Sequence, residues 1–410
     1  MRTETIRRIE LSLGRILCAI LTAVRRARDL IASDPKGPPQ RILFLKLTEQ
    51  GATVLACDAL RVAAERVGAE NLYFCVFAEN RWVLDVLDLL PAANVLPIRS
   101  DRFAWFVIDV LRMLRRVRQA RVDAVIDMEF FARATAIIAF LSGARLRAGL
   151  HRFSAEAPYR GDLFTHRVQH NPYLHASQSY RLLVEALWAD PSNAPLLKAR
   201  PEPTPVLPVF APSKDERAQV RAKVEEAAGW PLRGHLVLLN ANLDDKLPLR
   251  RWPPERFVEV GRRLLAERPD VIVGLTGVTS EQPAIEAMRD QIGSRAVCLA
   301  GRTTLREALV LYTLADVLVT NDCGPGHFAS LTDVDSIVLF GPETPQVFGP
   351  LGRHSEAVTA GLACSPCLNV YNHRLSACVD NVCMQAISVD DVVSRVLTAL
   401  AARAAKRAAP

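Results

Sequence analysis

The chain alternates short apolar runs with longer segments whose apolar positions recur every three or four residues. Apolar runs of this length predict buried strands, and the periodic segments predict amphipathic helices. In the first half the predicted strands are 41–46, 71–77, 94–98, 122–127 and 147–150. In the second half they are 235–240, 270–275, 296–299, 316–321 and 336–340. Strands alternating with helices in this way predict two doubly wound α/β domains, each with a parallel sheet and helices on both faces.

Helices are predicted at both ends of the chain and between the strands. The expected ranges are 3–32, 213–228, 254–267, 280–292, 303–314 and 388–405. The first of these helices is amphipathic, with an apolar stripe made of Ile6, Ile9, Leu13, Ile16, Leu17, Ile20, Leu21 and Val24. Seven prolines between residues 191 and 212 exclude a helix or a central strand there, so this segment is the expected linker. The expected organisation is therefore a basic helix at 1–36, a first domain at 37–190, the linker at 191–212, a second domain at 213–387 and a helix at 388–410.

The stretch 314–344 holds the clearest candidate for a ligand site. It predicts a strand, a loop at 322–326, a short helix at 327–331, a second strand and a second loop. Both loops open at the carboxyl edge of the sheet, where open α/β folds bind their ligands. Glycines in the first loop allow the backbone to approach a ligand closely, and the helix N-terminus suits a phosphate. Asp322 suits sugar hydroxyls better than phosphate.

Two other interpretations of this stretch remain open. It is also compatible with a structural strand–turn–helix joint that binds nothing. The run Gly324-Pro-Gly-His-Phe-Ala329, with Glu343 beyond it, also fits the dinucleotide fingerprint and would indicate a nicotinamide-dependent oxidoreductase. We rank the oxidoreductase lower, because only one further predicted strand follows and Pro325 stands inside the turn.

Two more loops of the second domain are expected at the same sheet edge. The loop after 235–240 contains Asn240, Lys246 and Arg250, which offer an amide and two cations for a diphosphate. The loop after 270–275 contains Thr276 and Glu281. Glu281 opens a helix, so its carboxylate either accepts hydrogen bonds from ribose hydroxyls or caps the helix.

Positive charge is concentrated in two predicted helices. Residues 1–36 carry eight Arg and Lys against four acidic residues, and residues 99–121 carry seven Arg against two Asp, while the whole chain has a formal net charge of +7. Basic amphipathic helices favour contact with an anionic lipid surface, and ordinary solvated faces are the alternative. The pattern lacks the broad basic face with interleaved aromatics that is typical of nucleic-acid binding. We find no apolar run of the ~20 residues needed to cross a bilayer and no cleavable signal, so we expect a cytoplasmic protein peripheral to the inner face of the cytoplasmic membrane.

Four of the nine cysteines form a cluster in the sequence: Cys364, Cys367, Cys378 and Cys383. In a reducing compartment, four thiolates at such spacings are compatible with a structural Zn²⁺ or iron site. The alternative is that the cysteines pack in a loop that covers the candidate ligand site.

Several motifs together resemble glycosyltransferase family nine, the ADP-heptose:lipopolysaccharide heptosyltransferases and their relatives. The most specific is Thr320-Asn-Asp-Cys-Gly-Pro-Gly-His-Phe-Ala329, followed by Val338-Leu-Phe-Gly-Pro-Glu-Thr344. Arg251-Trp-Pro-Pro-Glu-Arg-Phe257 and Gly301-Arg-Thr-Thr-Leu305 match two further blocks in the family order, and the likeness spans roughly 40–400.

The resemblance implies a GT-B fold and inverting, metal-independent transfer of a sugar from a nucleotide donor. By motif position, Asp322 through His327 would hold the donor sugar and phosphates, and Glu281 the ribose. Arg250 falls where relatives place a phosphate-binding lysine, and Lys246 is its rival. The expected donor-binding set is Asn240, Lys246, Arg250, Thr276, Glu281, Asn321, Asp322, Gly324, Pro325, Gly326, His327 and Glu343. Some protein-modifying relatives of this kind carry a four-cysteine metal finger. The resemblance therefore also implies a metal site at the cysteine cluster.

One position departs from the family pattern. Relatives carry the proposed general base, an aspartate, directly after the loop glycine of the first domain, where this chain has Ala52. Glu49 in the same loop is the nearest substitute and our candidate catalytic base, with Asp127 next. We therefore expect a transferase that moves a sugar such as heptose from an ADP-heptose-like donor to a lipid-linked or envelope saccharide such as the lipopolysaccharide core. The alternative is a non-catalytic relative that binds sugar nucleotides or glycans.

Overall fold

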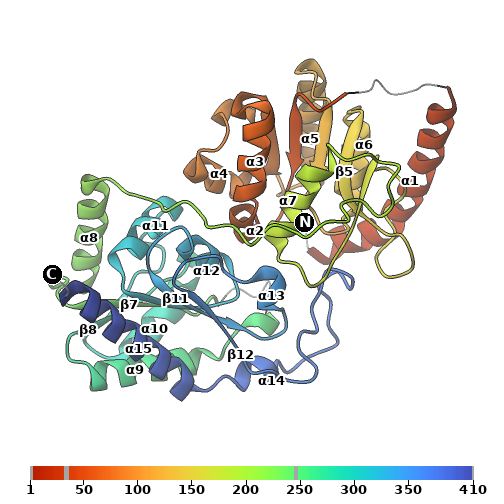
Figure 1. Cartoon of the computed structure of the whole chain (residues 1–410). Helices are drawn as coiled ribbons and strands as arrows, with labels where there is room; N and C mark the ends of the chain where they lie inside the picture. The colour runs from red at the N-terminus through yellow and green to blue at the C-terminus, as the bar shows by residue number, and fades with distance from the viewer. Residues whose placement is uncertain (1–2, 32–36, 244–247, 409–410) are drawn as a thin grey trace. The chain divides into compact units, whose positions relative to one another are not determined.

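The computed structural model describes residues 3–31, 37–243 and 248–408 (Figure 1). The chain forms two compact units. Unit 1 comprises the chain up to Pro205 together with Val370–His373, and unit 2 comprises Val206–Asn369 and the chain from Arg374 onward. The segment 370–373 is anchored in unit 1 through the ring of Tyr371, whose centroid lies 5.4 Å from that of His170.

A six-stranded parallel sheet forms the centre of unit 1, with the strand order β3-β2-β1-β4-β5-β6. The strands are β1 (Ile42–Leu45), β2 (Leu72–Phe77), β3 (Val95–Ile98), β4 (Ala124–Asp127), β5 (Leu146–His151) and β6 (His166–Gln169). The first five lie within two residues of their predicted ranges. The strand β6 was not predicted, because His166-Arg-Val-Gln169 contains a single apolar residue and therefore no apolar run. The order reverses between β1 and β4, which is where doubly wound sheets place their ligands.

In the described part of unit 1, seven α-helices flank this sheet. They are α1 (Thr3–Ile31), α2 (Gln50–Leu55), α3 (Cys57–Val67), α4 (Arg81–Leu87), α5 (Phe103–Gln119), α6 (Arg133–Leu141) and α7 (Ala176–Ala186). Residues of α1, α5 and α6 belong to one hydrophobic core with the strands β1 and β4. These three helices therefore form one layer on one face of the sheet, and α6 packs between the other two (Figure 1).

The N-terminal helix α1 packs on unit 1 through small and polar residues. Gly14, Cys18 and Thr22 are buried, whereas most apolar residues of the predicted stripe are exposed. The guanidinium of Arg25 forms an ion pair with Asp162 at 2.6 Å. The helix therefore belongs to the folded unit. Of the stripe residues whose side chains the structure describes, Leu21 packs against the core and the other five are exposed.

Unit 2 repeats the architecture with the strand order β12-β11-β10-β7-β8-β9. The strands are β7 (His235–Asn240), β8 (Val271–Leu275), β9 (Ala296–Cys298), β10 (Val317–Asn321), β11 (Asp335–Phe340) and β12 (Ser355–Thr359), and every neighbouring pair is parallel. The strand β12 was not predicted, since it lies at the sheet edge and most of its side chains are solvent-exposed. The fold class predicted from the alternation, two doubly wound parallel sheets, is confirmed in both units.

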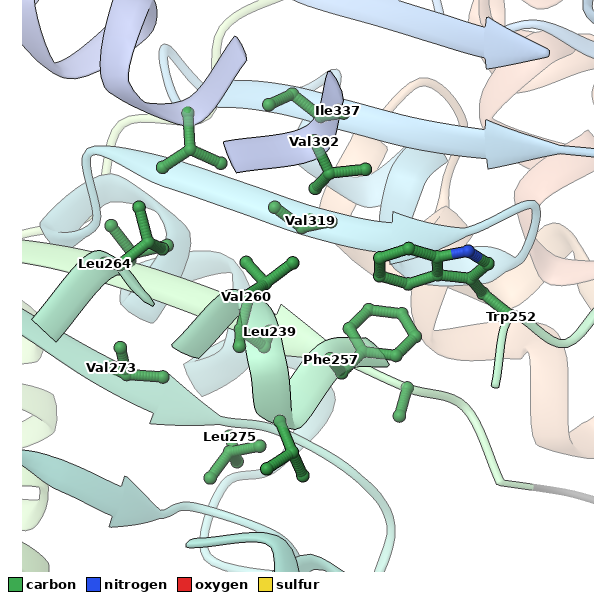
Figure 2. Packing of buried hydrophobic residues seen from close by; sticks show 14 of the residues in the cluster. Leu239, Trp252, Phe257, Val260, Leu264, Val273, Leu275, Val319, Ile337 and Val392 are labelled. Carbon is green, nitrogen blue, oxygen red and sulfur yellow. The ribbon is translucent and has the colours of Figure 1, made fainter. Parts of the chain in front are cut away.

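The helices of unit 2 are α8 (Lys214–Ala228), α9 (Pro254–Glu267), α10 (Gln282–Ile292), α11 (Leu305–Leu314), α12 (Gly324–Ala329), α13 (Pro345–Phe348), α14 (Val382–Gln385) and α15 (Val389–Ala408). Between α9 and the sheet, Trp252 and Phe257 pack edge to face with ring centroids 5.0 Å apart (Figure 2). The indole N–H of Trp252 donates to the Ile387 carbonyl at 3.1 Å, which ties α15 to the start of α9.

Two further features concern the surface of the fold. Asp335 begins β11 at the amino edge of the sheet and pairs with Arg403 of α15. Within the described ranges, no helix is both long and apolar enough to cross a bilayer.

Candidate active site

The loop between β10 and α12 lies at the carboxyl edge of the unit 2 sheet. Asn321 ends the strand, and the backbone N–H of Asp322 donates to the Leu339 carbonyl at 2.9 Å. The helix α12 begins at Gly324 rather than at the predicted His327, because Pro325 occupies its first turn, where a proline costs no hydrogen bond. His327 is buried in this short helix.

The glycines of this loop also serve packing. Neither Gly324 nor Gly326 adopts a positive φ angle. A Cβ atom on Gly326 would lie 3.0 Å from a methyl carbon of Val338. Gly326 thus allows α12 to pack closely on β11, and its predicted close approach to a ligand stays a prediction.

Three predicted donor-binding residues meet in one buried ion cluster at this edge. A guanidinium nitrogen of Arg250 lies 3.3 Å from a carboxylate oxygen of Asp322, and the other lies 2.8 Å from Glu343. The side chains of Asp322 and Glu343 are 5% and 1% exposed. Because a buried carboxylate needs a compensating cation, Arg250 is held firmly between the two loops.

A fourth member of the cluster, Arg374, was not predicted. Its Nε lies 3.2 Å from the same Glu343 oxygen, and its guanidinium stands over the ring of Phe348 at 4.9 Å from the centroid. Arg374 comes from the cysteine-bearing segment between β12 and α14 and has a φ of 56°, a conformation that is strained for a non-glycine residue. The run Tyr371-Asn-His-Arg374 shows no periodicity, so only the structure brings Arg374 to Glu343.

Burial shifts the titration of this cluster. Burial raises the pKa of Glu343 to about 8, although the nearby Arg250 charge opposes the shift. The pKa of Asp322 is also raised by burial, again against Arg250. Burial lowers the pKa of Arg374 to about 10, so that this guanidinium stays cationic at neutral pH. At pH 7 the cluster therefore carries two cations, and Glu343, with a pKa of about 8, is largely protonated.

Glu281 occupies the next loop along the edge. One carboxylate oxygen accepts the backbone N–H of Val278 at 2.8 Å, as expected for a cap. The other oxygen, Oε1, is buried and has no hydrogen-bond partner within the described part of the chain. A Cβ atom on Gly277 would lie 2.6 Å from the capping oxygen, so glycine there leaves room for the carboxylate. Glu281 therefore caps the turn with one oxygen, and its second oxygen is left without a hydrogen-bond partner among the described residues.

The remaining predicted donor residues of unit 2 chiefly brace the loops. The Asn240 amide donates to the Thr276 hydroxyl at 3.0 Å, which links the ends of β7 and β8. The amide of Asn321 donates to the Ala241 carbonyl at 2.7 Å, and its oxygen accepts the backbone N–H of Trp252 at 3.1 Å. These bonds fix the backbone that carries Arg250. Lys246, the predicted rival of Arg250, lies outside the described residues.

In unit 1, Glu49 lies at the carboxyl end of β1 beside a buried lysine. Its carboxylate lies 3.6 Å from the ammonium nitrogen of Lys46, and its side chain is 32% exposed. Glu49 precedes α2 with a φ of 66°, a left-handed conformation that costs free energy and that the surrounding contacts must maintain. The candidate base is therefore accessible to solvent and lies next to a buried cation.

Glu129, which the sequence reasoning missed, holds this loop in place. It lies 3.0 Å from the Lys46 ammonium and accepts the backbone N–H groups of Leu47 and Thr48, each at 2.8 Å. The signal in the sequence was Asp127-Met-Glu129, two carboxylates at the end of β4, the strand next to β1.

Asp127 and Ala52 are both enclosed by the fold. The Asp127 side chain is fully buried, pairs with Arg160 at 3.0 Å and accepts the Thr135 hydroxyl at 3.0 Å. Burial raises the pKa of Asp127 to about 6, against the Arg160 charge. With its oxygens occupied inside the core, Asp127 supports the Glu129 loop and is a poor second candidate for the base. Ala52 is buried in α2.

The four-cysteine metal site is not supported by the structure. Among the described residues, no group of three or more His, Cys, Asp and Glu side chains is placed to hold a metal ion. Cys364 and Cys378 are exposed, whereas Cys383 is buried in the core of unit 2, where a Cβ atom on Gly341 would lie 2.9 Å from its sulfur. Burial, with smaller effects of Cys367, Cys378 and Cys364, raises the pKa of the Cys383 thiol. As arranged, the thiols do not fit a tetrahedral site, and packing accounts for the buried one.

Comparison with known proteins identifies the family. The model of glycosyltransferase family 9 (heptosyltransferase) matches residues 110–376, which is more than half of the chain. The chain belongs to glycosyltransferase family 9. This assignment confirms the predicted resemblance, makes the protein a glycosyltransferase, and replaces the nicotinamide alternative.

Individual relatives agree with that assignment. Lipooligosaccharide heptosyltransferase 2 of Haemophilus influenzae is 32% identical over 108 residues, which are 25% of this chain and 31% of the relative. Lipopolysaccharide heptosyltransferase 2 of Salmonella typhimurium is 24% identical over 286 residues, 68% of this chain and 76% of the relative. The solved structure of the ADP-heptose lipopolysaccharide heptosyltransferase II of Escherichia coli superposes with a TM-score of 0.67 at 16% identity, covering 88% of this chain and 99% of the other. That likeness supports the GT-B fold.

Proposed function

We propose that this family 9 enzyme transfers a heptose from ADP-heptose to a lipid-linked saccharide of the lipopolysaccharide core. The printed names of the relatives, lipopolysaccharide and ADP-heptose heptosyltransferases, support this donor and acceptor class. The observation that carries the proposal is the buried ion cluster of Arg250, Asp322, Glu343 and Arg374, because two cations held at the carboxyl edge suit a diphosphate.

The leaving group is the first chemical demand of the reaction. When the bond between the anomeric carbon and the diphosphate oxygen breaks, ADP leaves with an extra negative charge. Arg250 and Arg374 neutralise this charge without a metal ion, and preorganised cations in a water-poor site stabilise such a transition state strongly. A protonated Glu343 does not compete with the phosphate for the two guanidinium groups. The buried Glu281 Oε1 accepts a ribose hydroxyl and fixes the nucleoside.

The second chemical demand of the reaction is removal of the proton from the attacking acceptor hydroxyl. Its oxygen attacks the anomeric carbon from the side opposite the diphosphate, so a single displacement inverts the configuration at that carbon. The hydroxyl proton passes to Glu49, the accessible carboxylate of the β1–α2 loop. Lys46 lies beside Glu49, and Glu129 holds the loop that carries both residues.

The place of the reaction follows from the acceptor. A lipid-linked core saccharide is anchored in the cytoplasmic membrane, and the nucleotide sugar that donates the heptose is a cytoplasmic metabolite. We therefore place the enzyme at the inner face of the cytoplasmic membrane as a peripheral protein. Nucleic acid has no part in this proposal.

The test measures donor binding and transfer separately. Calorimetry with ADP-heptose and ADP should show binding to the purified chain, and a heptose-deficient lipopolysaccharide core should then accelerate ADP release. The product should have the anomeric configuration opposite to that of the donor. Absence of ADP-heptose binding would refute the donor. Binding without any acceptor-dependent release would favour the non-catalytic alternative. That alternative is motivated by the buried Ala52, which stands where the family has its base.

A further inference from the structure

The helix α1 displays its apolar stripe to solvent. Leu13, Ile16 and Ile20 are 51%, 58% and 54% exposed, and Leu17 and Val24 are exposed beside them. These residues recur at helical spacing and so form one continuous strip. A surface helix normally turns such a strip toward the core, because burying it is the main source of its stability. In α1 the arrangement is reversed.

The opposite side of α1 is built for close docking on unit 1. A Cβ atom on Gly14 would lie 3.1 Å from the side chain of Arg133, so a larger residue here would have to displace that side chain. Across the contact, Gly161 has a φ of +75°, and a Cβ atom there would lie 2.8 Å from the Cys18 carbonyl oxygen. The Thr22 hydroxyl accepts the backbone N–H of Asp162 at 2.8 Å. These contacts fix which side of α1 faces outward.

The helix α5 adds a second exposed row in the same layer. Phe103, Val107 and Leu111 are exposed on it at intervals of four residues, and α5 shares the core of unit 1 with α1 and α6 (Figure 1). Arginines accompany both apolar rows: Arg15 and Arg26 on α1, and Arg102, Arg112, Arg115 and Arg116 on α5 are exposed. Apolar and aromatic side chains bordered by guanidinium groups match the interface of an anionic membrane, where the chains enter the acyl boundary and the charges meet headgroups.

We propose that the outer face of α1, together with the exposed row of α5, is a docking surface for an anionic lipid bilayer. The helix lies in the plane of the membrane interface and is fixed to unit 1. A second copy of the chain fits this surface less well, since a two-fold contact would place the arginines of one copy against those of the other. This inference concerns a surface distinct from the donor site and holds whichever sugar is transferred.

Vesicle binding by the full chain tests the proposal. The probe is a vesicle of phosphatidylcholine with one third phosphatidylglycerol, compared with pure phosphatidylcholine. The Ile16→Gln/Ile20→Gln variant should lose affinity for the anionic vesicles by roughly tenfold or more, because both side chains lose their apolar insertion. The matched control is Leu305→Gln/Val379→Gln, two exposed apolar residues of unit 2, which should bind like the parent.

Charge and folding are tested with the same vesicles. Arg15→Gln/Arg26→Gln should weaken binding at 0.1 M salt, and the difference should shrink at 1 M, where the screening length falls from about 10 to 3 Å. All variants should keep the parent's unfolding temperature, since the replaced side chains are exposed. No binding by the parent, or full binding by Ile16→Gln/Ile20→Gln, would overturn the proposal. So would a parent dimer that this variant dissociates while vesicle binding stays unchanged. None of these measurements uses donor or acceptor, so they remain distinct from the test of sugar transfer.

Discussion

Replacing Arg250 by methionine perturbs the donor-site ion cluster at its centre. Methionine keeps much of the apolar volume and removes the charge that lies 3.3 Å from Asp322 and 2.8 Å from Glu343. Removing one partner of a buried pair costs about 3–5 kcal/mol when the other charge must stay buried and ionised. The carboxyl groups in this cluster can avoid that state by keeping their protons.

The size of the loss should therefore depend on pH. A carboxyl whose pKa is raised in the folded protein keeps a proton that the unfolded chain has released, so its contribution to stability falls as pH rises up to the raised pKa. For Glu343 that pKa is about 8 with Arg250 present, and loss of Arg250 moves it higher. Below pH 8 Glu343 is protonated in both proteins, so at Glu343 the variant loses only hydrogen bonds, about 1–2 kcal/mol. Above pH 8 the difference grows by about 1.4 kcal/mol per pH unit.

Urea unfolding at pH 7 and pH 9.5 measures this difference. The loss of free energy of unfolding in Arg250→Met should be about 2 kcal/mol greater at pH 9.5 than at pH 7. The control is Arg268→Met, which breaks an exposed pair with Asp270 at 2.8 Å and should cost under about 1 kcal/mol at either pH. An equal loss at the two pH values in Arg250→Met would refute the reasoning, because it would show that Glu343 does not titrate in this range.

Three further predictions address other parts of the site and fold. Arg374→Gln should lower the affinity for ADP roughly tenfold or more, because one charge-assisted contact is lost, and it should lower the affinity for AMP less. Calorimetry measures both affinities, and equal losses for ADP and AMP would contradict the assigned contact. Glu49→Gln should keep donor affinity and slow transfer by roughly a hundredfold or more, and an unchanged rate of acceptor-dependent ADP release would exclude Glu49 as the base. Gly161→Val should loosen α1 from unit 1, because its branched side chain meets the Cys18 carbonyl and a positive φ suits it poorly, so amide hydrogen exchange should rise across residues 14–25 and stay unchanged in unit 2.

The sequence was sufficient where one physical rule governed a whole segment. Interior strands such as 235–240 are buried on both faces and form continuous apolar runs, so their ranges were predicted correctly. Edge strands such as His166–Gln169 and Ser355–Thr359 have only part of their surface buried and lack that run. The motif glycines drew attention to the right sheet edge, but their function in packing α12 depends on Val338, which lies on a different strand.

The site contacts that were missed depend on residues far apart in the sequence. Arg250 and Glu343 are 93 residues apart and Lys46 and Glu129 are 83 residues apart, and no local pattern records such pairs. The pattern of apolar residues also could not predict the orientation of α1. A stripe of isoleucines and leucines shows that a helix is amphipathic, but only Gly14 and Gly161 show which side meets the protein.

The docking of α1 has a consequence for the order of events during synthesis. Arg25 of this helix pairs with Asp162, 137 positions further along the chain. At about 5–20 residues per second, a ribosome needs on the order of ten seconds to make the partner after the helix has emerged. During that interval the glycine and threonine side of α1 has nothing to dock on, while its isoleucine side is already complete. An amphipathic helix of this kind can form on a lipid surface without the rest of its domain. If α1 binds lipid as proposed above, the nascent chain reaches the membrane before unit 1 has folded, and unit 1 then assembles on a helix that is already in place.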